Sequence, residues 1–572
     1  MRPISDRLTV NHRPGTGRGR WWALVSLCAG TSLLELVLLA VFDPTARPQL
    51  APQTNAIAPF GVFGDLRWLS VYNTSWVALG GEAVALLAVR TTMTALSVHL
   101  AWPAHVPRPG PARLLTRSAV ATVLSAALLL PSVVVLFGAA VVPVSWLFLA
   151  GVPAALLVAV VLHPVGISGD WWRRALPPRG VAWVTLSFVV LSLSGSVVGV
   201  LPRPFWPLVC ILAGLFNAWA WVGAVHAVVD RRAPRFTVPL VPVAIVGLAV
   251  VVVAGTTLGF DQARPPATTA ARTGTALGAG GAGPRLGQPL LLVAGYGSTW
   301  DGTASHPVPG PFYEVRFSYR GLSRTGTPLP YGSYDTVKSL AVLDRMFLGQ
   351  VHALARRSGR KVAVVAESEG AMVAKTALLA SPGAPVDQLV LASPLEAAGR
   401  VVYPASGQHQ GWGLATGQAL VVLDRALEGI SPVDLSPHSA FLSSLDSAAP
   451  LLVGAMSCPL PTVRQFALVP LADATVTGAG TLPFPTVVLA AFHGGLVESP
   501  QGAHDVADLL LSKPVQSDQL LRTAETTISY VSGAWQVPSL SPSAFASYGH
   551  DTSGASCAKL AAHLSQELRR PH

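Results

Sequence analysis

The segment Lys361–Ala380 reads KVAVVAESEGAMVAKTALLA, and it decides the fold of the C-terminal half of this 572-residue chain. Its first six residues are a short, mostly apolar run of the kind found in buried strands, and its last ten are small and apolar residues typical of a helix. Between them, Glu367-Ser368-Glu369-Gly370 predicts a sharp turn. A strand, a turn centred on serine and a helix rich in small residues together indicate a nucleophile elbow.

Strands and helices alternate on both sides of this segment. Pro289–Val293 is a buried-strand run, Tyr313–Ser318 predicts a second strand, and Ser339–Ser358 has apolar residues at helical spacing. Later in the chain, Gln465–Val469 and Thr486–Ala491 are again short and apolar. This alternation is the pattern of an α/β fold, so we expect a mostly parallel sheet flanked by helices.

Two loops that follow late strands contain residues that could complete a catalytic site with Ser368. Asp473 lies in the loop after Gln465–Val469, and His493 begins a His-Gly-Gly-Leu run after Thr486–Ala491. Other residues compete for these two positions. They are Asp434, Asp446 and Asp505 for the acid, and His504, which follows a helix-like break rather than a strand end, for the histidine.

In these segments the chain resembles the α/β-hydrolases, and within them the bacterial lipases and esterases. The elbow has Ala-Glu-Ser-Glu-Gly where the family usually has Gly-x-Ser-x-Gly, and alanine at the first position is a variation found among bacterial lipases. The stretch Asp434–Leu442 is similar to one that those lipases carry between nucleophile and acid. The matches run from about Pro289 to Leu510, and they imply a triad of Ser368, Asp473 and His493.

The resemblance also implies a role for each part of the site. A serine hydroxyl becomes a nucleophile when histidine accepts its proton, and the carboxylate orients the imidazole. The backbone N–H groups of Tyr296 and Glu369 would bind the oxyanion. The side chains of Glu367 and Glu369 could disfavour anionic substrates, but we interpret them as solvated surface charges. This chemistry needs no cofactor.

The four cysteines are too few for a disulfide scaffold or a cysteine-based metal site. Cys458 and Cys557 could form a disulfide if the C-terminal half faces an oxidising compartment. Cys28 and Cys210 lie inside apolar segments and are expected to be buried. The sequence contains no CxxC, HExxH or Cys/His cluster, so no metal is indicated.

The N-terminal half has the composition of a membrane domain. Hydrophobic residues make up 51% of the whole chain and charged residues only 12%, about half the charged share of a typical soluble protein. Between residues 21 and 258, apolar stretches of roughly 20 residues recur, each long enough to cross a bilayer. We expect an all-α bundle of seven spans: Trp21–Phe42, Trp76–Leu100, Ala119–Val142, Val144–His163, Val181–Leu201, Phe205–Val229 and Val238–Leu258.

Arginines predict the orientation of these spans. Arginine-rich segments precede the first span and follow the second, fourth and sixth, so seven spans place them all on one side. The positive-inside rule assigns that side to the cytoplasm. We therefore expect a multi-pass protein of a bacterial cell membrane, with a cytoplasmic N-terminus and an extracytoplasmic C-terminal domain.

Five polar residues lie in or near the spans: Glu35, Glu82, Arg90, Asn217 and His226. Polar groups inside a membrane are expensive and often functional. The sequence shows no internal repeat or pair of broken helices of the kind that transporters have. We therefore expect these residues to serve packing or structural pairing rather than transport.

These observations divide the chain into a cytoplasmic segment (1–20), a multi-span domain (21–258), a flexible linker (259–284) and a hydrolase domain (285–572). The resemblance implies a serine hydrolase of the esterase or lipase type, with the bilayer as partner and acyl esters as substrates. Lipids or acylated envelope components are the expected esters. There are two alternatives. One is an acyltransferase with the same triad, and the other is a sensor or transporter whose hydrolase-like domain only binds a ligand. The net charge of +11 reflects arginines beside apolar spans, and we expect no nucleic-acid partner.

Overall fold

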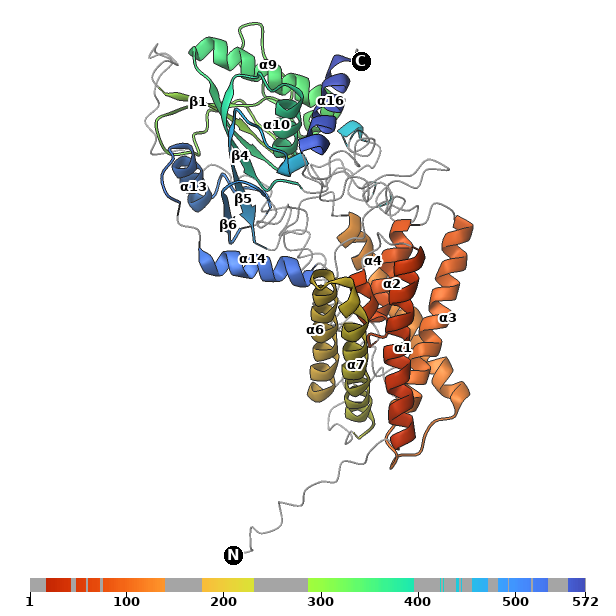
Figure 1. Ribbon diagram of the computed structural model, residues 1–572. Helices are drawn as coiled ribbons and strands as arrows, with labels where there is room; N and C mark the ends of the chain where they lie inside the picture. Colours follow the sequence, from red (N-terminus) through yellow and green to blue (C-terminus); the bar gives the residue numbers. More distant parts are fainter. Residues whose placement is uncertain are drawn as a thin grey trace, which may run out of the picture.

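The protein has two parts, an N-terminal bundle of apolar helices and a C-terminal sheet covered by helices (Figure 1). The structure is a computed structural model. It describes residues 17–42, 48–57, 60–72, 76–138, 177–230, 287–395, 422, 425, 439–441, 444, 455–471, 482–491, 493–515, 518–532 and 554–570.

The sheet has six strands, all parallel, in the order β2-β1-β3-β4-β5-β6. The strands are β1 (Gln288–Val293), β2 (Phe312–Arg316), β3 (Val362–Glu367), β4 (Val386–Ala392), β5 (Arg464–Pro470) and β6 (Thr486–Leu489). The sequence predicts five of them to within two residues and misses β4, whose apolar run is interrupted by Asp387 and Gln388. The expected parallel sheet flanked by helices is confirmed.

Side chains of the strands alternate between two apolar layers, as the two-residue period of a strand requires. Leu291 and Val364 point to one face and belong to a core shared with three helices. These helices are α9 (Leu340–Ser358), α10 (Glu369–Ala380) and α16 (Gly554–Arg569). Leu290 and Val365 point to the other face, which α13 (Pro500–Leu510) covers (Figure 1). The central strands β1, β3 and β4 are therefore buried on both sides, so the loops at their carboxyl ends rest on a rigid base.

Five helices of the described residues are long and apolar enough to cross a membrane. They are α1 (Arg18–Phe42), α3 (Trp76–Ala101), α4 (Pro111–Gly138), α6 (Pro178–Val200) and α7 (Trp206–Val229). They correspond to five of the seven expected spans, although α4 begins eight residues earlier than predicted. The other two, Val144–His163 and Val238–Leu258, lie outside the described residues, so the number seven stays a prediction.

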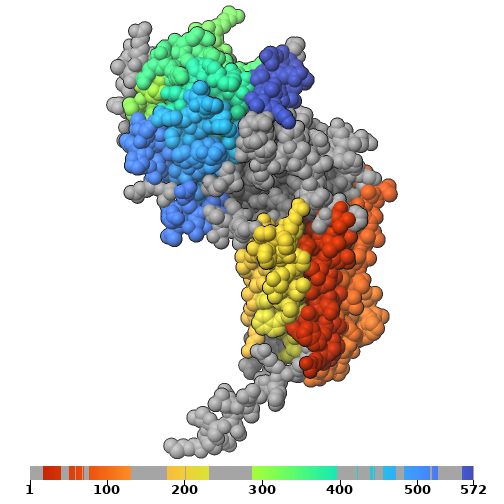
Figure 2. Space-filling view, in the orientation of Figure 1, coloured from red at the N-terminus to blue at the C-terminus, as the bar shows by residue number. Residues whose placement is uncertain are grey.

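The bundle combines close helix packing with an apolar outer surface. A Cβ atom on Gly214 of α7 would lie 2.5 Å from the Cα atom of Ala29, so α7 and α1 approach each other backbone to backbone. Small residues permit the same approach in membrane helices generally. Leu34 and Leu38 of α1 and Leu212 of α7 are nevertheless exposed, and Figure 2 shows α1 (red) beside α6 and α7 (yellow) on one continuous face. Lipid accommodates such a face better than water does.

Polar residues within the bundle form pairs. Arg90 of α3 donates to the carboxylate of Asp65, in a helix that the sequence analysis did not predict, α2 (Phe60–Tyr72). The hydroxyl of Ser187 donates a hydrogen bond of 2.8 Å to the side-chain oxygen of Asn217. Both pairs join different helices, which agrees with the structural role expected for Arg90 and Asn217.

The two parts of the protein meet at one end of the bundle. Helix α14 (Gln519–Ser532) contacts both α6 and β6, and it lies between the bundle and the sheet in Figure 1. At the opposite end, Nη1 of Arg20 donates to the carbonyl oxygen of Trp102 (3.2 Å), which places the start of α1 beside the turn between α3 and α4. Arg108 and Arg113 belong to this same end. Arg20, Arg108 and Arg113 therefore lie at the end of the bundle away from the sheet, whereas Arg203 lies in the connection between α6 and α7. The orientation in a membrane stays a prediction.

Candidate active site

Ser368 lies in the turn between β3 and α10 with a strained backbone. Its φ and ψ angles are 55° and −115°, in a region that residues other than glycine rarely occupy. The N–H of Ser368 donates to the carbonyl oxygen of Ala392 on β4 (2.9 Å), and its own carbonyl accepts from the N–H of Ala371 in α10 (3.0 Å). The serine is thus held on both sides, with its side chain at the carboxyl edge of the sheet.

Two glycines let other segments approach this turn. A Cβ atom on Gly370 would lie 2.7 Å from the carbonyl oxygen of Ala294, closer than packing allows. A Cβ atom on Gly295 would lie 3.0 Å from the Cβ atom of Ser368. The start of α10 therefore lies against the end of β1, and the loop after β1 lies directly against the serine.

His493 is the histidine that meets Ser368. Its Nε2 atom lies 2.8 Å from the hydroxyl oxygen of Ser368, and its side chain is 1% exposed. The competing His504 is exposed on α13, where Asp505 accepts from the side chain of Gln501 (3.1 Å). The structure thus brings together Ser368 and His493, two of the three predicted catalytic residues.

The predicted acid Asp473 lies outside the described residues, as do the competing Asp434 and Asp446. The described part of its loop ends at Leu471, whose N–H donates to the carbonyl oxygen of Leu489 at the end of β6 (2.8 Å). The start of the acid loop is therefore tied to the strand that leads into the histidine loop.

The predicted oxyanion-binding groups belong to segments on two sides of Ser368. The N–H of Glu369 is in the first turn of α10, where a helix leaves its N–H groups without partners within the helix. Tyr296 follows Gly295 in the loop against the serine, and its ring packs on Phe441 with 5.5 Å between ring centroids. Two backbone donors that flank a nucleophile on separate segments are the arrangement that an oxyanion hole requires.

The interpretation of Glu367 and Glu369 as solvated surface charges is wrong. Glu369 is 1% exposed, and burial raises its pKa well above the usual range. Burial also raises the pKa of Glu367 to about 7, even though its carboxylate accepts a 2.8 Å hydrogen bond from the N–H of Leu496. Glu369 is buried and Glu367 is half-buried beside a segment distant in sequence, so both belong to the framework of the site.

Tyr319 holds the loop after β1 beside Glu369. Its hydroxyl donates to the carbonyl oxygen of Ala294 (2.5 Å), the residue that precedes Gly295. The two carboxyl oxygens of Glu369 are buried and have no hydrogen-bond partner among the described residues.

Ser393 positions the histidine loop and was not singled out from the sequence. It follows β4 with a positive φ of 48°, and its side chain is fully buried. Its hydroxyl donates to the carbonyl oxygen of His493 (2.7 Å). A serine directly after a buried strand is the only local signal, and it does not identify the partner.

Cys458 and Cys557 form a disulfide, as the sequence analysis allows, with 5.6 Å between their Cα atoms. The bond joins the segment before β5 to α16. Beside it, Nζ of the fully buried Lys375 donates to the carbonyl oxygen of Cys458 (2.5 Å), and burial lowers the pKa of this lysine to about 7. The disulfide and the lysine together attach α10 to its neighbours behind the site.

The arrangement supports proton transfer from a serine hydroxyl to an imidazole. Within the described ranges, no three His, Cys, Asp or Glu side chains are grouped so that they could hold a metal ion. A serine hydroxyl this close to an imidazole nitrogen can act as a nucleophile with the histidine as base. No protein-family model, curated protein or solved structure matches this chain.

Proposed function

We propose that the C-terminal part is an α/β-hydrolase domain and that the protein is a membrane-anchored serine hydrolase that cleaves acyl esters. The observation that carries this proposal is the 2.8 Å separation between the hydroxyl oxygen of Ser368 and Nε2 of His493. The strained φ of Ser368 and the close approach at Gly370 support it, because both are features of a nucleophile elbow.

The reaction follows from the positions of these groups. The hydroxyl oxygen of Ser368 attacks the carbonyl carbon of the ester, and its proton passes to Nε2 of His493. The N–H groups of Tyr296 and Glu369 bind the resulting oxyanion, and Asp473 orients the imidazole. The imidazolium then protonates the leaving alcohol, and a water molecule, activated by the same histidine, hydrolyses the acyl-enzyme.

The place of the sheet domain supports substrates of the membrane or envelope. The domain lies at one end of an apolar bundle, and the arginines Arg20, Arg108 and Arg113 lie at the other. By the positive-inside rule the arginine end is cytoplasmic, so the hydrolase domain is extracytoplasmic. Lipids and acylated envelope components are the acyl esters found beside such a domain.

The proposal is tested by labelling the full chain, solubilised in detergent, with a fluorophosphonate, which reacts with activated serines. We expect labelling of the native protein, none of Ser368→Ala, and labelling at least about 1000-fold slower for His493→Ala. His504→Ala is the matched control and should label normally. Labelling that persists in Ser368→Ala, or a folded native protein that is not labelled, would refute the proposal. Product analysis with an added alcohol then separates hydrolysis from acyl transfer.

A further inference from the structure

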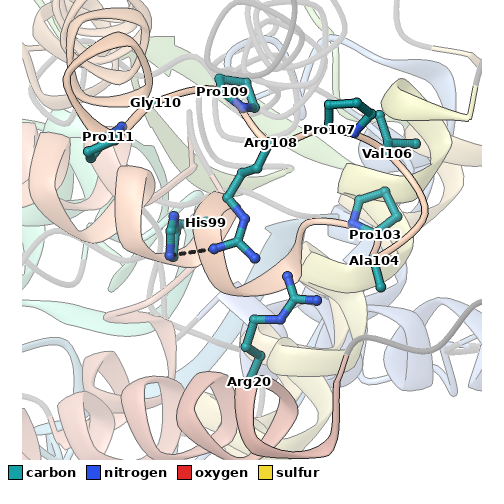
Figure 3. Close-up of a pocket in the computed structure, with 10 residues that line it drawn as sticks. All are labelled: Arg20, His99, Pro103, Ala104, Val106, Pro107, Arg108, Pro109, Gly110 and Pro111. Atoms are coloured by element: carbon teal, nitrogen blue, oxygen red, sulfur yellow. Dashed lines mark hydrogen bonds between the residues drawn. The ribbon is translucent and has the colours of Figure 1, made fainter.

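A basic pocket lies at the end of the bundle away from the sheet domain. It has a volume of about 530 Å³ and is formed where the start of α1 meets the end of α3 and the loop that leads to α4 (Figure 3). Its charged or titratable side chains are Arg20, His99 and Arg108. The proposed hydrolase mechanism uses none of them.

The two arginines face each other across this pocket. In Figure 3 the guanidinium groups of Arg20 and Arg108 point toward one another from α1 and from the loop. Nη1 of Arg20 donates to the carbonyl oxygen of Trp102 (3.2 Å), and Nη1 of Arg108 donates to Nε2 of His99 (2.8 Å). A guanidinium has five N–H donors. Among the described residues, each arginine uses its Nη1 group in this way, so other N–H groups of both guanidinium groups remain for a ligand.

The charge of the pocket is not balanced by its lining. Among the described residues that line it there is no carboxylate. Asp230, at the end of α7, is engaged by His105 with 2.9 Å between Nε2 and the carboxylate oxygen. Partial burial, and then the positive charge of Arg20, lower the pKa of Arg108. Two like charges that face each other repel, and an anion between them replaces this repulsion with two attractions.

Prolines restrict the loop that carries Arg108. It reads Trp102-Pro-Ala-His-Val-Pro-Arg-Pro-Gly-Pro111, so prolines stand on both sides of the arginine. Proline fixes φ and removes much of the conformational freedom that would otherwise be lost on binding. The pocket also lies where α1 begins and α3 ends, and the phosphates of a bilayer lie beside the ends of helices that span it. A pair of preorganised guanidinium groups at this level matches the geometry of a phosphate.

We propose that this pocket binds a phosphate ester between the guanidinium groups of Arg20 and Arg108. Two sources offer this chemistry, the headgroup of an anionic phospholipid and a soluble phosphate ester. The helices that contribute Arg20 and His99 also carry exposed apolar side chains, among them Trp22 of α1 and Leu96 of α3, which suits the lipid.

The test uses the full chain in detergent. Native mass spectrometry measures retention of phosphatidylglycerol against phosphatidylcholine, and calorimetry measures binding of glycerol 3-phosphate. We expect Arg20→Gln with Arg108→Gln to weaken binding by at least about tenfold. Arg108→Gln alone should weaken ligand binding by a smaller factor, because Arg20 remains and the side chain of Arg108 is exposed. Arg108→Lys, which keeps the charge, should fall between that variant and the native protein.

Arg113→Gln is the matched control, since it removes one charge from the same end of the bundle outside the pocket. It should bind like the native protein. Phosphatidylglycerol lost from the double variant identifies the lipid as the source, and glycerol 3-phosphate lost from it identifies the soluble ester. Binding of neither ligand to the native protein, or undiminished binding to double variants with a native thermal midpoint, would overturn the proposal.

Discussion

The hydroxyl of Ser393 donates a 2.7 Å hydrogen bond to the backbone carbonyl of His493, although 100 residues separate the two along the chain. Ser393 directly follows β4, whereas His493 follows β6, which is two strands away in the sheet. The N–H of Ser393 in turn donates to the carbonyl oxygen of Leu468 on β5 (2.9 Å). Ser393 therefore connects three strands at the edge where the histidine must be held.

Replacing Ser393 with alanine tests this connection. Without the hydroxyl, the buried carbonyl of His493 loses its donor, and the imidazole is less well aligned with Ser368. We expect fluorophosphonate labelling to slow by about tenfold to a hundredfold and stability to fall by about 1–2 kcal/mol. Ser358→Ala is the control, because Ser358 is also buried but bonds only to residues at and just after the end of α9, namely Leu354, Ala355 and Arg360. It should lose similar stability at an unchanged labelling rate, and an equal loss of labelling in both variants would contradict the connection.

Gly370→Ala tests the close approach at the elbow. The added methyl group would meet the carbonyl oxygen of Ala294 at 2.7 Å, so the loop after β1 must move. We expect a loss of about 1–3 kcal/mol of stability together with slower labelling of Ser368. Gly349→Ala in α9 is the matched control, since nothing lies within 4 Å of its added methyl group. It should be neutral or more stable by up to about 1 kcal/mol. A tolerated Gly370→Ala variant with native labelling would disprove the steric argument.

Glu367 makes stability depend on pH. Its pKa in the folded protein, about 7, lies above the ordinary value of 4.5. Its contribution to stability is therefore fully present below about pH 4.5 and is lost as the pH rises through 7. Glu367→Gln should reduce this fall in the free energy of unfolding by up to about 3 kcal/mol.

The measurement for Glu367 is the thermal unfolding midpoint of the detergent-solubilised protein between pH 4.5 and 7.5, for native and variant chains. Glu567→Gln serves as control, because Glu567 lies on α16 paired with Arg570 and is not among the charges that shift the pKa of Glu367. If the native protein and Glu367→Gln gave parallel profiles, the carboxyl group of Glu367 would not titrate in this range.

The Cys458–Cys557 disulfide closes a loop with a sequence separation of 99 residues and attaches α16. Ser565 of α16 also donates to the carbonyl oxygen of Ala380 at the end of α10 (2.8 Å). Reduction, or replacement of both cysteines by serine, should cost about 2–5 kcal/mol. Thermal unfolding with and without a reductant measures this. The double variant should not respond to the reductant, and a native protein equally indifferent to it would show that the bond contributes nothing.

The parts of the site that could be predicted from the sequence are those that depend on residues close together in the chain. The strand, serine turn and helix at Lys361–Ala380 are local, and Gly370 is visible because a glycine closes that turn. The same holds for five strands of the sheet. Helix α16 could also have been predicted, because its buried residues Cys557, Leu560 and Leu564 recur at helical spacing.

The parts that could not be predicted depend on contacts between distant segments. Glu367 lies beside a turn, and a charged residue in that position is usually solvated. Its actual partner is the N–H of Leu496, which follows 129 residues later in the chain. The partner of Ser393 is similarly remote. Lys375 looks like the polar face of α10, but the packed segment before β5 covers it. Burial of a charged group is decided by tertiary packing, which no local pattern contains.

Helix α14 touches both β6 and α6, so the sheet domain is attached to the bundle by a packed contact as well as by the covalent chain. A body joined at one point can rotate about it, whereas a second attachment removes that freedom. These two attachments restrict the position and orientation of Ser368 relative to the helices of the bundle. Several helices side by side also resist tilting in a way that one helix does not. For the hydrolase that we propose, this attachment would make the distance of a substrate from the bilayer a criterion of selection beside its chemistry.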